Sequence, residues 1–169
     1  WFNVFVGKSA GANSTGGCNV FIGYQSGQNR STGQHNVAIG RCAFKGSGSA
    51  TGGCNAVFGV CAGHSVSSGN FNTLIGPNAG MGITTGSCNV VVGYGATVTT
   101  TTGNHQLAIG IGNSNWISGD SSFNVSLSGQ VNLNGMSKES INIVANKLSA
   151  ATDINLEDGL VHYFSTTET

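Results

Sequence analysis

The chain has 169 residues, of which 28 are Gly and only 7% are charged, and its formal net charge is zero. So few basic residues argue against nucleic-acid binding, and no run approaches the roughly 18 apolar residues of a membrane span. Hydrophobic residues make up 38% of the chain and recur periodically, which argues against disorder because that apolar surface can be buried.

A short phrase recurs seven times from the first residues to residue 110. The copies read NVFVG, NVFIG, NVAIG, NAVFG, NTLIG, NVVVG and QLAIG, and their first residues are spaced by 16, 17, 19, 17, 17 and 17 residues. Such a period is the signature of stacked structural units. We therefore predict an all-β protein whose residues 1–119 form a parallel β-solenoid, or β-roll, of about seven coils. Because the chain starts inside a repeat, we expect it to be a fragment or a processed product.

Two residue types hold fixed positions in this repeat. Gly ends every phrase, where a turn needs a positive φ or a close chain approach. These residues are Gly7, Gly23, Gly40, Gly59, Gly76, Gly93 and Gly110. Asn opens six of the phrases, at Asn3, Asn19, Asn36, Asn55, Asn72 and Asn89. Coils stack about 4.8 Å apart, so we expect these amides to hydrogen-bond along a ladder with a structural role.

The three residues between Asn and Gly are apolar almost throughout, so both faces of each expected strand are apolar. We expect the first and third of them to face the core, and the middle one to face another chain, because a 17-residue coil looks too thin to enclose both faces. The candidate subunit-interface residues are Phe5, Phe21, Val57, Leu74 and Val91. The pattern therefore predicts self-association.

The sequence changes after the repeats. Residues 120–129 look like a degraded eighth coil or a transition. Residues 130–169 show shorter alternations, such as Ile141/Ile143 and Ile154/Leu156, which are typical of strands. We expect this part to form a slimmer, β-prism-like stem.

Five cysteines occupy two positions of the repeat. Cys42 and Cys61 share one position in adjacent coils, within reach of a disulfide, and the alternative is a pair of small buried thiols. Cys18, Cys54 and Cys88 alternate with His35 and other residues directly before the phrases, but without the ligand spacings of a zinc site. We expect no metal and no cofactor.

No grouping of residues indicates catalysis, because the repeats contain Lys and Arg but no acid. We therefore expect no enzyme activity. Three sequons are candidate glycosylation sites: Asn13, Asn29 and Asn124.

The repeat resembles two known groups of proteins. Units such as NVAIG, with a small residue three positions later, are similar to the head repeat of trimeric autotransporter adhesins. The TGxxNVxIG units, with the later segments NWISGDSSFNV and VHYFSTTET, also resemble tail-fibre and other virion structural proteins of marine and cyanobacterial phages, and this likeness covers more of the chain. Both resemblances imply a homotrimeric extracellular fibre.

The expected function is accordingly a structural fibre segment of a virion that supports host attachment. Its expected partners are further copies of itself, other virion or fibre proteins, and a receptor or glycan on the host surface. The alternatives are a trimeric bacterial adhesin head and a subunit of an extracellular filament.

Overall fold

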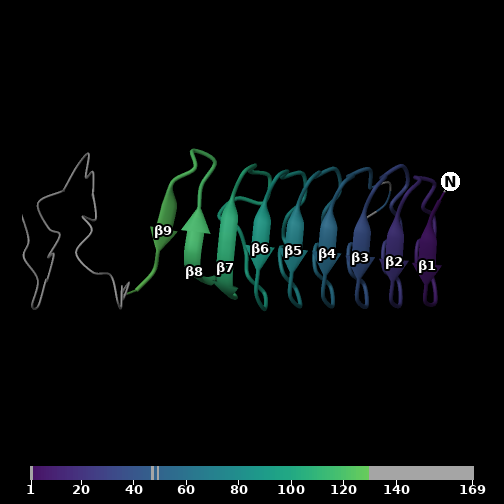
Figure 1. Ribbon diagram of the computed structural model, residues 1–169, viewed down its shortest axis with the longest axis horizontal. Helices are drawn as coiled ribbons and strands as arrows, with labels where there is room; N and C mark the ends of the chain where they lie inside the picture. The colour runs from purple at the N-terminus through teal and green to yellow at the C-terminus, as the bar shows by residue number, and fades with distance from the viewer. Residues whose placement is uncertain (1, 47, 49, 130–169) are drawn as a thin grey trace, which may run out of the picture. The chain divides into compact units, whose positions relative to one another are not determined.

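The computed structural model describes residues 2–46, 48 and 50–129. Within these residues the fold is all-β without a helix, and nine short strands lie side by side in chain order in a single sheet (Figure 1). The strands are β1 (Val4–Val6), β2 (Val20–Ile22), β3 (Val37–Ile39), β4 (Ala56–Phe58), β5 (Thr73–Ile75), β6 (Val90–Val92), β7 (Leu107–Ile111), β8 (Ser114–Gly119) and β9 (Val125–Leu127).

Strands β1 to β7 pair in parallel, each with the equivalent strand of the next repeat. The register matches repeat positions directly, so that Val20 pairs with Val37 and Val37 with Ala56. Between successive strands the chain makes one full coil, as the stacked loops in Figure 1 show. The predicted parallel β-solenoid is therefore confirmed for this part of the chain.

The interior of the coil lies on the opposite face of the strands from the one expected. The middle residue of each strand from β2 to β6, as in Phe21 and Leu74, is fully buried within the single chain. It packs against small residues of the opposite wall, such as Ala62 and Ala79, and against Val66. In so narrow a coil, one side chain from each wall fills the interior. The prediction that the first and third residues of each strand face the core was therefore wrong.

This arrangement corrects the predicted subunit interface. Phe21, Val57, Leu74 and Val91 are core residues with no exposed surface, so they cannot contact another chain. Phe5, in β1, is partly exposed, and its ring stacks on Phe21 with 5.2 Å between the ring centroids. The side chains that face outward are instead the first and third residues of each strand.

The Gly that ends each of the first six phrases has two reasons to be Gly. At Gly40 the φ angle is 136°, and a Cβ placed there would lie 2.5 Å from the carbonyl oxygen of Gly59 in the next coil. An L residue would be strained and would also push the coils apart. This close stacking explains why Gly recurs at the end of these six phrases, whereas at Gly110 the atoms that a Cβ would meet belong to Ser114 and Asn115 of β8.

The parallel array ends at β7, and the chain then reverses. β8 pairs antiparallel with β7, and β9 pairs antiparallel with β8. In earlier coils, the third residue after the Gly that ends the phrase is small and buried, as Ala96 is. After Gly110 the same position holds the exposed Asn113.

Residues 114–129 are therefore an antiparallel extension of the sheet, with β8 and β9 where the sequence analysis expected the end of the last coil and a degraded eighth coil. A role of residues 120–129 as a transition stays a prediction. The predicted stem at 130–169 lies outside the described residues.

Candidate functional site

The regular spacing of Asn along the repeat builds a ladder inside the coil. The Nδ2 group of Asn55 donates to Asn36 Oδ1 at 3.1 Å and to the carbonyl oxygens of Gly53 and Gly69, both at 3.0 Å. Its Oδ1 accepts from the backbone N–H of Asn72 at 2.9 Å. Because these amides are buried and satisfy backbone groups at the corner, their role is to hold successive coils in register.

The largest unusual surface is the outer face of the parallel sheet. We define the outer face as the first and third residues of strands β1 to β7. Its side chains are Val4, Val6, Val20, Ile22, Val37, Ile39, Ala56, Phe58, Thr73, Ile75, Val90, Val92, Leu107 and Ile109. All are at least partly exposed, with Ile39 at 38% and Ile75 at 42%.

Thirteen of these fourteen side chains are apolar, Thr73 being the exception. Exposed tyrosines, Tyr24 and Tyr94, follow two of the strands and extend the apolar surface. Seven strands about 4.8 Å apart give a strip about 29 Å long, and three residues at about 3.3 Å each give a width of about 10 Å, or roughly 290 Å². The largest apolar patch on a typical monomer is of about this size and is often functional.

A second surface feature runs along one corner of the coil. We call it the thiol corner, and it consists of the residues directly before the phrases: Cys18, His35, Cys54, Phe71, Cys88 and His105. All six have left-handed backbone conformations, with φ between 57° and 59°. The three thiols are exposed, and Phe71 is 63% exposed.

The candidate disulfide pair lies at another corner. Cys42 is buried and Cys61 is partly buried, and both thiols are free in the structure. Burial raises the pKa of the Cys61 thiol, and the neighbouring Cys42 raises this pKa further. The two side chains are therefore close to one another, and the disulfide itself stays a prediction.

A buried arginine, Arg30, lies in the coil interior, and no sequence pattern indicated its burial. The Arg30 guanidinium donates to the carbonyl oxygens of Val66 and, at 3.2 Å, of Gly52, and it lies 3.7 Å from the ring centroid of Phe44. Burial lowers the pKa of Arg30 to about 10. These contacts tie together the coils around the longest repeat, so the role of Arg30 is structural.

The sequon residues are all engaged in hydrogen bonds. Asn13 Nδ2 donates to Asn29 Oδ1 at 2.9 Å, and Asn29 Nδ2 donates to the carbonyl oxygen of Gly46 at 3.5 Å. Asn124 Nδ2 donates to Asp120 Oδ2 at 2.9 Å, which together with backbone donors lowers the pKa of Asp120. Glycosylation at these residues stays a prediction.

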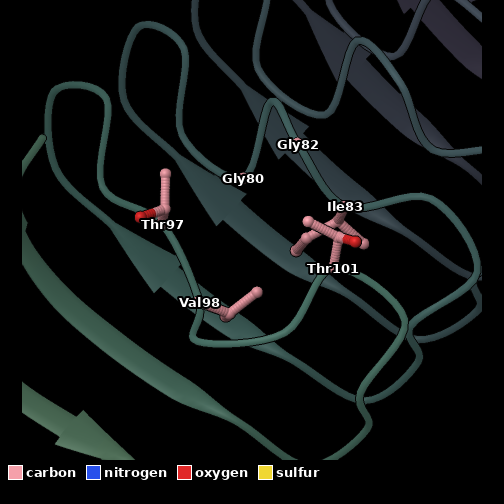
Figure 2. A pocket seen from close by; sticks show the side chains of 6 residues that line it. All are labelled: Gly80, Gly82, Ile83, Thr97, Val98 and Thr101. Atoms are coloured by element: carbon pink, nitrogen blue, oxygen red, sulfur yellow. The ribbon is translucent and has the colours of Figure 1, made fainter. Parts of the chain in front are cut away.

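Figure 2 shows a shallow hollow between two coils, with a volume of about 40 Å³. Its lining residues are Gly80, Gly82, Ile83, Thr97, Val98 and Thr101. This volume holds one or two water molecules at most. It carries no titratable group and offers no site for an organic substrate.

Among the described residues, no three side chains of the His, Cys, Asp and Glu types come together as metal ligands would. No helix in this part of the chain is long and apolar enough to cross a membrane.

No family model, curated protein or solved structure matches the chain. The interpretation of its function therefore depends on its own residues and on the resemblance of its repeat.

Proposed function

We propose that the chain is a structural segment of a virion tail fibre or similar appendage, in which three copies pack in parallel and support attachment to a host. The observation that carries the proposal is the outer face, a continuous apolar strip that a closed single coil leaves in water. Burying one such side chain fully is worth about 1.5–3 kcal/mol. When copies pack side by side with their coil axes parallel, every strand buries part of its outer-face side chains and contributes part of this free energy.

The geometry of the sheet suits a fibre. Parallel strands in direct register repeat the same surface on each coil, so copies related by an axis along the coils meet with matching residues at every level. The acid-free repeats carry few charges that would oppose such packing. A stack of coils tied by the Asn ladder gives reach and rigidity, which are the properties that an appendage requires.

The proposed partners are copies of the same chain, other virion or fibre proteins, and a host surface receptor or glycan. The proposed location is the virion or the extracellular space, and no catalysis is proposed. The resemblance to phage fibre proteins supports this reading, while a trimeric bacterial adhesin head shares the same architecture and remains the second candidate.

An end-to-end filament has less support. β8 lies along the free edge of β7 in an antiparallel pairing, so that edge is not open for a further parallel coil of another copy. Growth by continued coil stacking would need this pair of strands to separate.

Electron microscopy of the intact chain tests the proposal, together with one variant and its control. Ile75→Lys places a charge on the outer face and is expected to convert short uniform rods into single chains. Thr85→Lys adds the same charge at an exposed position away from that face and should leave the rods intact. Filaments of unlimited length, or single chains from the unaltered protein, would contradict the proposal.

A further inference from the structure

The three thiols of the thiol corner are held in line by the backbone. The N–H of Cys54 donates to the carbonyl oxygen of Gln34, and the N–H of Cys88 donates to that of Asn70, both at 2.9 Å. Each corner residue is thus fixed to the coil before it. The exposed side chains of Cys18, Cys54 and Cys88 follow one edge at intervals of two coils.

These thiols cannot pair within one chain. Two coils separate neighbouring thiols by about 9.6 Å, whereas the Cα atoms of a disulfide lie within about 7 Å of one another. The intervening coils hold His35 and Phe71 at the same position. Any protein disulfide formed at this corner must therefore join two molecules.

The corner lies at the margin of the outer face. Cys18, Cys54 and Cys88 each stand two residues before the first residue of a strand, and that residue belongs to the outer face. In a parallel trimer whose threefold axis runs along this corner, the equivalent corner residues of the three copies meet at matching levels. Thiols evenly spaced along such an edge then meet their own equivalents.

We propose that Cys18, Cys54 and Cys88 form disulfides between neighbouring copies of this chain, each with the same cysteine of the neighbour. This inference rests on the parallel packing in the proposed function. In a trimer, each level brings three thiols together and forms one disulfide with one thiol left over. Three levels are enough to connect all three chains covalently.

The chemistry needs an oxidant, which we take to be a small disulfide such as oxidised glutathione. A thiolate of one copy attacks the oxidant and releases one reduced glutathione. The thiolate of the second copy then attacks the mixed disulfide and releases the other. Two thiols are oxidised to one protein disulfide, and one oxidised glutathione is reduced to two thiols.

The test uses full-length chains that retain one corner cysteine at a time, with the other four cysteines changed to Ser. After treatment with oxidised glutathione, each of the three variants is expected to give a covalent dimer on a non-reducing gel. The dimer should disappear on reduction. A chain that retains only Cys42 and Cys61 is the control and is expected to run at its single-chain mass of 17.0 kDa.

The three variants also report on orientation. In an antiparallel pair, Cys54 would meet Cys54, but Cys18 would meet Cys88. Cross-linking of the Cys54 variant alone, together with cross-linking of a variant that keeps both Cys18 and Cys88, would overturn the inference and the parallel packing.

Other outcomes separate the two proposals. One outcome is that oxidation gives chains that carry glutathione but no covalent dimers, while the reduced protein still sediments as a trimer. That result would overturn the disulfide proposal and leave the fibre proposal standing. A reduced protein that is a single chain by sedimentation would contradict the fibre proposal itself. Multimers that need added zinc and that disperse with a chelator would replace the disulfide by metal binding.

Discussion

Replacement of Asn55 by Ala tests the ladder that holds the coils together. Asn55 is almost completely buried, and its side chain satisfies partners on both neighbouring coils. The substitution removes the acceptor of the Asn72 N–H and a donor to the Gly69 carbonyl. Both backbone groups stay buried and lose these partners.

Each unsatisfied buried group costs about 1–3 kcal/mol, so the two together give about 2–6 kcal/mol. We expect the free energy of unfolding to fall by about 4 kcal/mol, a large part of the stability of an ordinary domain. A related substitution, Asn55→Asp, replaces an amide that donates three hydrogen bonds with a carboxyl group. Its cost should be lowest at acidic pH, where the carboxyl is protonated, and should grow as the pH rises.

Urea unfolding followed by circular dichroism measures the effect at a fixed protein concentration. Asn113→Ala is the matched control, because Asn113 is exposed and makes one side-chain contact, with Thr97 at 3.3 Å. The control should lose less than about 0.5 kcal/mol. A loss below about 1 kcal/mol for Asn55→Ala would refute the argument that the ladder stabilises the coil.

Two pairs of substitutions and one labelling experiment follow from the structure. Gly40→Ala should destabilise the protein by about 3 kcal/mol through backbone strain and the clash with the next coil, whereas Gly82→Ala, with ordinary space around its Cβ and no positive φ, should cost little in the same urea assay. Arg30→Ala should cost about 3 kcal/mol because it leaves a cavity and unsatisfied carbonyls, and Arg30→Met, which keeps the stem packing, should cost less; equal losses by calorimetry would argue against a contribution from packing of the stem. Iodoacetamide should modify the three thiols of the thiol corner first and Cys42 and Cys61 later, and the rate at Cys61 should rise at higher pH than for an ordinary thiol, because its pKa is raised; early modification of Cys61 at neutral pH, read by mass spectrometry, would contradict the raised pKa.

The parallel solenoid was predictable because the repeat leaves little choice. Seven phrases at one period, each ending in Gly, require stacked coils with the same turn in every unit. The register of the strands follows directly from the alignment of the phrases, as Val20 with Val37 shows.

The direction of the strand faces was not predictable from periodicity alone. All three residues of a phrase such as NVFIG are apolar, so alternation does not say whether Phe21 or its neighbours point inward. The deciding factor is the opposite wall, where small residues such as Ala43 leave room for one large side chain per coil. Knowing how the coil closes is necessary before the interior can be assigned.

Two other features depend on contacts that have no local sequence signal. Arg30 stands at a repeat position where later coils have Val66 and Ile83, and its carbonyl partners lie in coils far along the chain. The reversal at β8 falls where the repeat ends, and Asn113 stands at the position that holds small residues in earlier coils. Both features depart from the repeat, so the repeat pattern does not predict them.

Sedimentation equilibrium of the reduced, full-length chain tests the central claim most directly. The claim is that the interior is closed within one chain while the apolar outer face is covered by further copies. The account predicts a mass of three times 17.0 kDa across a range of concentrations, and a shift to the single-chain mass for Ile75→Lys. A stable single chain at all concentrations, with the outer face in water, would contradict it.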